Sequence, residues 1–189
     1  MDIDFTIKAP EHMPPLRTSV ITQDLIRAIL NRYPLPWGGI HGVKHWARVL
    51  ENGRRLSEST GARRDVVELF AVFHDSRRTN EGIDDGHGRR GSELAGKLRG
   101  KAYELDDEAF ALLIQACDLH TEGYLDGDLT LRACWDADRL DLGRVGITPR
   151  PEKLCTQEAR EATLLMWATE RSERFFLPAL VSEEWGVHL

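Results

Sequence analysis

LFAVFHD, residues 69–75, closes a strongly apolar segment with an imidazole and a carboxylate. Apolar residues recur at intervals of three and four through this segment, at Val66, Leu69, Phe70 and Phe73. That spacing predicts a helix that begins near Arg64 and buries one face. An unpaired carboxylate is costly to bury at the end of such a helix unless it is paired or bound to a cation. Because imidazole and carboxylate are good ligands for divalent ions, His74 and Asp75 are candidate metal ligands.

Helical periodicity continues on both sides of this segment. We expect helices after Thr22, over about 43–58, from Arg64, over about 88–98, after Asp106 or Asp107, over about 129–141 and after Thr156. In the last of these, Ala159, Ala162, Leu165 and Met166 share one side. Residues 1–20 contain three prolines and are interpreted as an extended N-terminal arm, with residues 3–8 as a candidate short strand. The sequence therefore predicts an all-α fold, a single compact domain of six or seven helices over residues 21–189.

Length and composition set limits on the class of protein. A chain of 189 residues, 41% hydrophobic and 30% charged, is typical of one globular domain. The longest apolar run, 175–181, has seven residues, whereas a membrane span needs about 20. No basic, apolar leader is visible near Asp2 and Asp4, and three widely spaced cysteines form neither a disulfide framework nor a CxxC zinc site. We expect a cytoplasmic protein without a membrane partner, with cysteines that pack as small apolar residues.

The charge is unevenly distributed along the chain. The net charge is −6, yet residues 41–100 carry 12 Lys and Arg against 9 Asp and Glu, a local excess of +3. An acidic chain is a poor general binder of nucleic acid, because that affinity depends on neutralising many phosphates. The basic block favours a small anion as the partner.

A second group of carboxylates lies at 136–141, in the sequence DADRLD. In a helix Asp138 and Asp141 share a face, whereas Asp136 points elsewhere. Two interpretations stay open from the residues alone. The segment is either a solvated acidic helix end, or one of its aspartates binds the same cation as His74 and Asp75.

Three segments together resemble the HD-domain superfamily of metal-dependent phosphohydrolases. The order His45, then His74-Asp75, then Asp138 is similar to the signature of that family. The local sequences HWARV at 45–49, LFAVFHD at 69–75 and DADRLD at 136–141 are similar as well. The resemblance covers about residues 37–145, which would form the core of an HD-type domain, with further helices over 146–189.

The resemblance implies a divalent metal bound by His45, His74, Asp75 and Asp138. It also implies that His87 and His120 either hold a second ion or act on the phosphate. N/O ligands of this kind accept manganese, iron, nickel, zinc or magnesium, so the metal and the choice between one and two ions stay open. His41, four residues before His45, is interpreted as a neighbour of the ligands.

The implied reaction is attack of a metal-bound water on a phosphate ester of a nucleotide or related small molecule. Asp75 would orient the water, and His87 and His120 would contact the phosphate or protonate the leaving oxygen. Guanidinium groups match phosphate oxygens, so Arg77, Arg78 and Arg89, with Arg90 beside them, are candidate substrate ligands.

Three alternatives remain. The same fold could serve as a non-catalytic metal- and nucleotide-binding regulatory module. The histidines could be structural parts of a helical scaffold. A nuclease acting on polymers would need a strong salt dependence of binding, which the net charge of −6 argues against. Assembly into a homo-oligomer is also left open.

Overall fold

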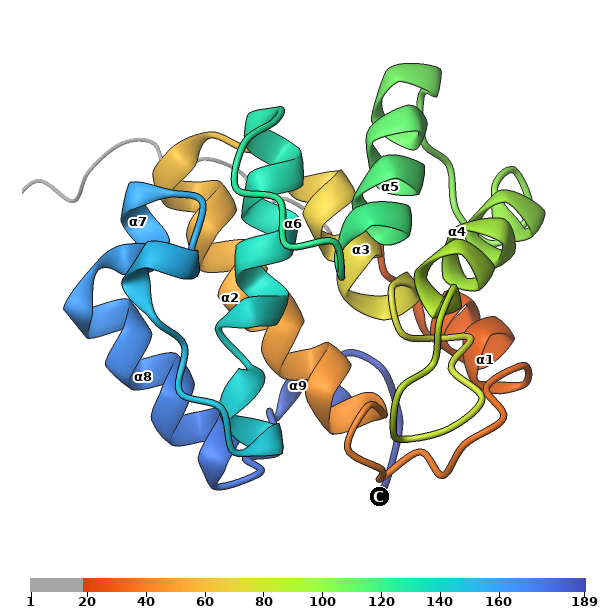
Figure 1. Cartoon of the computed structure of the whole chain (residues 1–189). Helices are drawn as coiled ribbons and strands as arrows, with labels where there is room; N and C mark the ends of the chain where they lie inside the picture. The colour runs from red at the N-terminus through yellow and green to blue at the C-terminus, as the bar shows by residue number, and fades with distance from the viewer. Residues whose placement is uncertain (1–18) are drawn as a thin grey trace, which may run out of the picture.

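The computed structural model describes residues 19–189, and this range is helical without a strand. Its helices of eight residues or more are α1 (Gln23–Leu30), α2 (Val43–Thr60), α3 (Arg64–Phe73), α4 (His87–Leu98), α5 (Asp107–Leu119), α6 (Leu129–Arg139) and α8 (Ala162–Glu173) (Figure 1). Short turns of helix are α7 (Gln157–Arg160), α9 (Leu180–Glu183), η1 (Leu142–Val145) and η2 (Pro151–Lys153). The predicted all-α fold is confirmed. The expected arm and the candidate strand at 3–8 lie outside the described residues, apart from the arm's last two positions.

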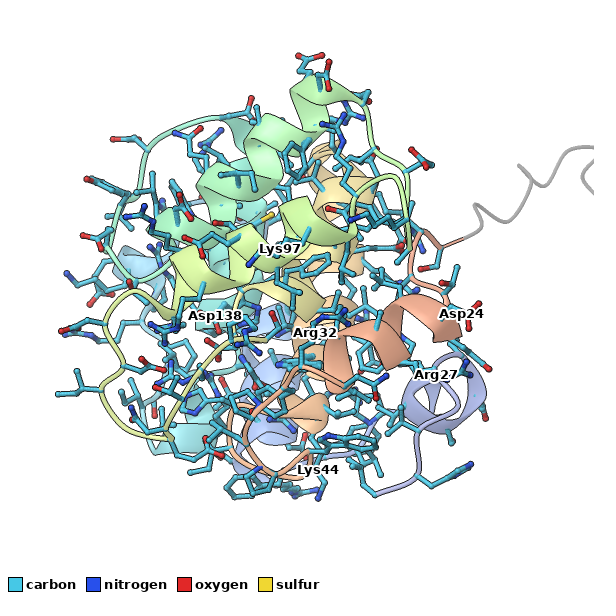
Figure 2. All side chains as sticks on the ribbon, turned by 90° about the vertical axis from the view of Figure 1, so that its right-hand side faces the viewer. Asp24, Arg27, Arg32, Lys44, Lys97 and Asp138 are labelled. Carbon is cyan, nitrogen blue, oxygen red and sulfur yellow. The ribbon has the colours of Figure 1, made fainter. Side chains whose placement is uncertain are left out.

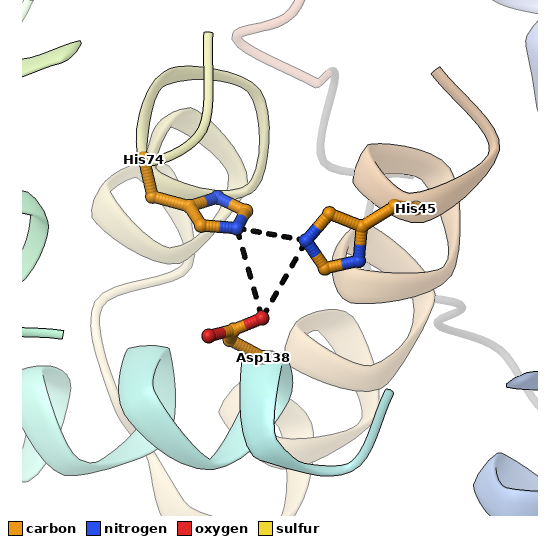
Figure 3. Close-up of side chains that lie close together, drawn as sticks. All are labelled: His45, His74 and Asp138. Atoms are coloured by element: carbon orange, nitrogen blue, oxygen red, sulfur yellow. Dashed lines mark hydrogen bonds and ion pairs between the residues drawn. The ribbon is translucent and has the colours of Figure 1, made fainter. Parts of the chain in front are cut away.

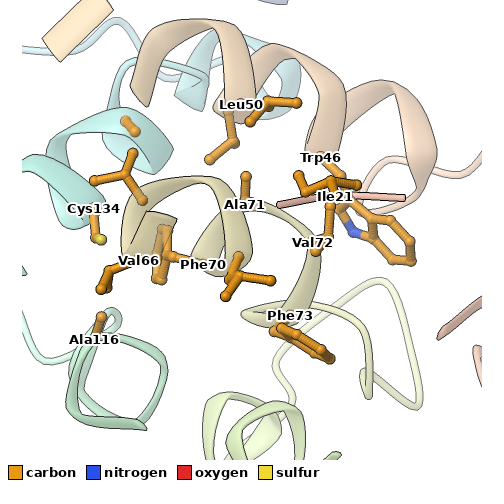
Figure 4. Packing of buried hydrophobic residues seen from close by; sticks show 14 of the residues in the cluster. Ile21, Trp46, Leu50, Val66, Phe70, Ala71, Val72, Phe73, Ala116 and Cys134 are labelled. Carbon is orange, nitrogen blue, oxygen red and sulfur yellow. The ribbon is translucent and has the colours of Figure 1, made fainter. Parts of the chain in front are cut away.

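Helix α3 lies in the interior of the bundle. Every residue from Val66 to Phe73 is buried. The helix packs against α2 on one side and against α5 and α6 on the other, and Figure 4 shows its side chains among Leu50, Ala116 and Cys134 of those helices. Complete burial of a side chain such as Phe73 stabilises the fold by about 1.5–3 kcal/mol. This packing fixes the position of the end of α3, where the imidazole–carboxylate pair begins.

Several helix ends form as the sequence predicts. The Thr22 hydroxyl caps α1 by accepting a hydrogen bond from the Leu25 backbone N–H at 3.1 Å. The Asp106 carboxylate caps α5 through the Ala109 N–H at 2.9 Å. Gly61 follows α2 with φ of 81°, a left-handed conformation that glycine adopts without strain.

Helix α1 is amphipathic. Its buried residues are Leu25, Ile26, Ile29 and Leu30. Its outer face carries the exposed ion pair between Asp24 and Arg27 (Figure 2). Such exposed pairs contribute little to stability. Like every other helix within residues 19–189, α1 lacks the length and apolarity needed to cross a bilayer.

A buried carboxylate, Glu68, anchors the beginning of the described chain to α3. Its oxygens accept from Arg54 Nε at 2.9 Å, from Arg64 Nε at 3.0 Å and from the Ser19 hydroxyl at 2.7 Å. These two arginines therefore serve the fold, and the charge of Glu68 is compensated where it lies.

The C-terminal segment departs from the predicted single long helix. The chain leaves helical geometry at Glu161 (φ −60°, ψ 127°), which separates α7 from α8. The sequence places Ala159, Ala162, Leu165 and Met166 on one side of a single helix, but Ala159 is fully buried and Met166 is 71% exposed. That expectation is wrong because the break changes the helical register. Helix α8 instead packs against η1 through its last turns, where Ser172 is fully buried.

Candidate metal centre

Three side chains from distant parts of the chain meet inside the bundle (Figure 3). His45 lies in the first turn of α2, His74 follows α3 directly, and Asp138 lies near the end of α6. The two imidazole Nε2 atoms are 3.0 Å apart. Asp138 Oδ1 lies 3.5 Å from His45 Nε2 and 3.7 Å from His74 Nε2. Both histidines are fully buried, whereas the Asp138 side chain is 15% exposed.

Asp75 completes this group and joins it to a second one. Its Oδ2 lies 3.4 Å from His45 Nε2 and 3.7 Å from His74 Nε2. Its other oxygen, Oδ1, lies 3.0 Å from His87 Nε2 and 3.8 Å from His120 Nε2. The two Nε2 atoms of that second group are 2.9 Å apart. One buried carboxylate thus faces two pairs of imidazoles.

The separations fit ligands around a common ion. Ligand atoms about 2.1 Å from a metal lie roughly 3.0 Å apart at right angles and roughly 3.4 Å apart in a tetrahedron. The Nε2 atoms of His45 and His74 lie 3.0 Å apart, and the nearest oxygens of Asp75 and Asp138 lie 3.4 to 3.7 Å from them. The group of Asp75, His87 and His120 spans 2.9 to 3.8 Å. His45, His74 and Asp138 could hold one metal ion, and Asp75, His87 and His120 could hold another.

Acceptors behind the four rings determine which nitrogen is free to bind. Each Nδ1 lies within hydrogen-bond distance of an oxygen that can only accept: Asp141 Oδ2 behind His45 at 2.7 Å, Phe70 O behind His74 at 3.0 Å, Asp84 O behind His87 at 2.6 Å and Cys117 O behind His120 at 2.7 Å. Each Nδ1 must therefore carry the proton. In the neutral ring the Nε2 lone pair is then unprotonated and directed into the cluster, as in metal-bound histidines.

This arrangement is unfavourable without a cation. Two unprotonated Nε2 atoms face each other at 3.0 Å in the first group and at 2.9 Å in the second. Asp75 Oδ1 and Asp138 Oδ1 are buried and have no hydrogen-bond donor. Buried lone pairs that face one another repel, and a shared positive ion removes the repulsion. The residues present therefore fit a divalent metal.

The protonation states also suit metal binding. Burial lowers the pKa of His74 to about 3, so this ring is neutral at physiological pH. Burial raises the pKa of Asp75, but the neighbouring imidazoles of His74 and His120 outweigh it and leave that pKa well below its ordinary value. The pKa of Asp138 is lowered in the same way, by His74 among others, against the effect of burial. Neutral imidazoles and ionised carboxylates are the forms that bind metals.

A chain of polar contacts orients His45 from behind. Asp141 accepts from the ring Nδ1 and also from Arg48, whose Nε and Nη2 donate to its two oxygens at 2.6 and 2.9 Å. Arg48 also donates to the Phe176 carbonyl at 3.0 Å, which links the site to the C-terminal segment. The sequence predicts that Asp138 and Asp141 share a helix face, but α6 ends at Arg139 and the two carboxylates contact opposite nitrogens of the His45 ring. The role of Asp141 behind the ring and the role of Arg48 were missed, because 93 residues separate the pair.

Asp136, the other aspartate of this segment, has a structural role. It is fully buried on the far side of α6 and accepts from the Cys155 N–H at 2.7 Å and from the Thr156 N–H and hydroxyl, both at 2.8 Å. It therefore holds the chain that leads into α7 against α6.

Replacing Asp136 with alanine is expected to lower the free energy of unfolding by about 2–4 kcal/mol, since two buried N–H groups lose a charged acceptor. Metal affinity should stay within about threefold of the wild type, because Asp136 faces away from the cluster. Urea denaturation and metal titration measure the two quantities. Asp138→Ala is the matched variant with the reverse pattern, and a tenfold loss of metal affinity in Asp136→Ala would show that this assignment is wrong.

Of the arginines singled out in the sequence, Arg78 lies at the cluster. It is buried, and its Nη1 is 3.5 Å from Asp75 Oδ1 and 3.2 Å from His87 Nε2. Arg144, in η1, is a second buried arginine at the cluster that sequence reasoning missed. Its Nη2 lies 3.8 Å from Asp138 Oδ1.

The other candidate arginines point away from the cluster. Arg77 donates to the Arg32 carbonyl. Arg89 pairs with Glu93 at 3.4 Å, and its side chain is 78% exposed. Within residues 19–189, neither forms a hydrogen bond or an ion pair with the metal-ligand groups.

His41 lies next to the ligands, as interpreted from the sequence, and takes part in neither metal-binding group. Its Nδ1 is 2.6 Å from Glu81 Oε2, and its backbone N–H donates to the same oxygen at 3.2 Å. Glu81 therefore holds the loop before α4 to the loop before α2.

No family model, curated protein or solved structure matches this chain, so the interpretation of the site rests on its own geometry.

Proposed function

We propose that the protein is a metal-dependent phosphohydrolase of the HD-domain type, which cleaves a phosphate ester of a nucleotide or a related small molecule. The observation that carries the proposal is the buried double group of imidazoles that shares Asp75. Its ligands follow one another along the chain in the order of the HD signature, and buried arginines beside it supply the positive charge that a phosphate needs.

The chain's own residues have separable tasks in this reaction. A divalent ion held by His45, His74, Asp75 and Asp138 would supply Lewis-acid activation of water and neutralise phosphoryl charge. Arg78 is placed to donate to a phosphoryl oxygen above Asp75 and His87.

His120 is suited to proton transfer at Nε2. Burial lowers its pKa, but the neighbouring carboxylates of Asp75 and Asp138 outweigh burial and raise that pKa overall. A raised pKa favours a proton on Nε2 when no second ion is bound there, and that proton can pass to the leaving oxygen. If a second ion occupies the group of Asp75, His87 and His120, both rings serve as ligands instead. The metal-to-protein ratio separates these two forms of the mechanism.

The alternative is a regulatory module that binds metal and nucleotide without turnover. The complete set of buried ligands favours the enzyme, because binding alone does not require a second group of imidazoles around Asp75. Turnover is the property that separates the two.

The test is a panel of phosphomonoesters and phosphodiesters assayed with untagged protein and Mn²⁺, Fe²⁺, Ni²⁺, Zn²⁺ or Mg²⁺. We expect ion-dependent hydrolysis that is lost in Asp138→Ala and retained in Asp24→Ala, which removes an exposed aspartate of α1. Bound metal without hydrolysis across the panel would favour the regulatory module. Absence of bound metal would contradict both functions and leave a helical scaffold with structural histidines.

A further inference from the structure

The guanidinium of Arg144 is buried at the edge of the metal-ligand groups and only partly bonded. Its Nη1 donates to the Asp141 carbonyl at 3.1 Å and lies 3.9 Å from Asp141 Oδ2. Its Nη2 lies 3.8 Å from Asp138 Oδ1, beyond hydrogen-bond distance, and its Nε is buried without a partner. Only 6% of the side chain is exposed. A buried guanidinium with unused donors is costly unless a further acceptor binds to it.

Arg78 is placed on the other side of the ligands. It lies at the Asp75 and His87 end, whereas Arg144 lies at the Asp138 end. The two guanidinium groups therefore lie at opposite ends of the metal-ligand groups, each beside an aspartate that faces the imidazoles.

The charged side chains around the metal-ligand groups have no net charge before a metal ion is bound. The charged side chains in contact with the four metal-binding histidines or their carboxylate partners are the aspartates Asp75, Asp138 and Asp141 and the arginines Arg48, Arg78 and Arg144. Their charges cancel. One divalent ion leaves an uncompensated charge of about +2 and two ions about +4, and the half-exposed Glu81 reduces either value by about one. A site with bound metal therefore requires an anion.

We propose that Arg144 and Arg78 form a two-sided clamp for the phosphoryl group, and that the substrate is a phosphate monoester. This inference rests on the proposed hydrolase function. A monoester offers three unesterified oxygens, one for each arginine and one for the ion, whereas a diester offers two. Arg144 contacts phosphoryl oxygens in this arrangement and leaves the binding of the metal to the histidines and aspartates.

The test compares metal affinity with phosphate affinity in the same variants. Inorganic phosphate is titrated calorimetrically into Mn²⁺-loaded wild type, Arg144→Gln, Arg144→Lys and Arg78→Gln. Phosphate affinity should fall about 10- to 100-fold in both glutamine variants, since each loses hydrogen bonds to a charged acceptor. Arg144→Lys, which keeps the charge without the fork, should lie between them and the wild type. Arg174→Gln, which removes an exposed arginine paired with Glu170, serves as the control and should match the wild type.

Mn²⁺ affinity distinguishes a phosphate-binding role of Arg144 from a purely structural one, because the two roles predict different changes in that affinity. Arg144→Gln removes a positive charge next to the ion, so Mn²⁺ should bind as tightly as in the wild type or more tightly. If Arg144 merely positions Asp138, Mn²⁺ and phosphate affinities fall together, and the clamp is overturned. Unchanged phosphate affinity in Arg144→Gln overturns it as well.

The clamp and the hydrolase function can fail separately. With an active enzyme, Arg144→Gln should lose at least tenfold more kcat/KM on monoesters than on diesters, and equal losses contradict the monoester assignment. Phosphate binding that depends on both arginines, without turnover of any ester, supports the clamp and contradicts the hydrolase. Turnover that persists with unchanged phosphate affinity in Arg144→Gln contradicts the clamp and leaves the hydrolase intact.

Discussion

Replacing Asp75 with asparagine is expected to lower the affinity for divalent metal by at least about 100-fold, more than any other single change at the site. Asp75 faces both pairs of imidazoles, with Oδ2 3.4 Å from His45 Nε2 and Oδ1 3.0 Å from His87 Nε2. The amide has the same size as the carboxylate but lacks its charge and one of its two acceptor oxygens. Turnover should be lost together with the metal.

Elemental analysis and Mn²⁺ titration of untagged protein measure this effect. Asp24→Asn is the matched control, because it makes the same chemical change at an exposed position on α1. Circular dichroism should show helical content equal to that of the wild type in both variants. A normal metal content in Asp75→Asn would mean that the shared carboxylate is not a ligand, and the two-group description of the site would be wrong.

Replacing Gly91 of α4 with alanine is expected to destabilise the fold. A Cβ at Gly91 would lie 2.3 Å from the Phe73 carbonyl oxygen and 3.1 Å from that of His74. These are backbone atoms at the end of α3, so the helix itself must move. Overpacking of this kind lowers the free energy of unfolding by about 1–3 kcal/mol. We expect a loss at the upper end of that range, because α4 must move away from α3.

Gly96→Ala offers the comparison within the same helix. Its Cβ would meet only the Phe110 ring at 3.6 Å, an ordinary contact, and alanine is favoured over glycine in a helix by about 1 kcal/mol. Urea denaturation should therefore show Gly91→Ala less stable and Gly96→Ala more stable than the wild type. Equal stability of the two variants would show that α4 does not need its close approach to α3.

Periodicity and capping residues were sufficient to predict the helices that carry the site. Helix α3 is buried along one continuous segment from Val66 to Phe73, so the spacing of its apolar residues is enough to predict it. The capping residues Thr22, before α1, and Gly61, after α2, likewise mark helix ends that can be predicted from the neighbouring sequence. The structure also brings together His45, His74, Asp75 and Asp138, whose association was expected from the resemblance to the HD family.

The residues around the ligands could not be found in this way, because they act across the fold. Arg48 and Asp141 lie 93 positions apart, and no local pattern couples them. Nothing in the local sequence distinguishes Arg144 from other arginines, and only the fold, through η1, places its side chain beside Asp138. Among the paired arginines, the sequence alone did not show which faced the site, since Arg78 and Arg77 are adjacent in the chain yet contact different parts of the molecule.

The C-terminal helices illustrate a second limit. Ala162 and Met166 continue the helical spacing that starts at Ala159, so a single helix was expected. The chain leaves helical geometry at Glu161, a few residues after Asp136 of α6 binds the backbone of Cys155 and Thr156. Tertiary contacts of this kind override a short periodic signal.

The most direct test of the metal centre is an anomalous-difference map from crystals of untagged protein equilibrated with Mn²⁺. We predict a peak about 2.0–2.3 Å from His45 Nε2, His74 Nε2, Asp75 Oδ2 and Asp138 Oδ1. A second peak between Asp75 Oδ1, His87 and His120 would establish the two-ion form. A map without density at the first position, with the four side chains ordered around it, would contradict the assignment of this cluster as a metal site.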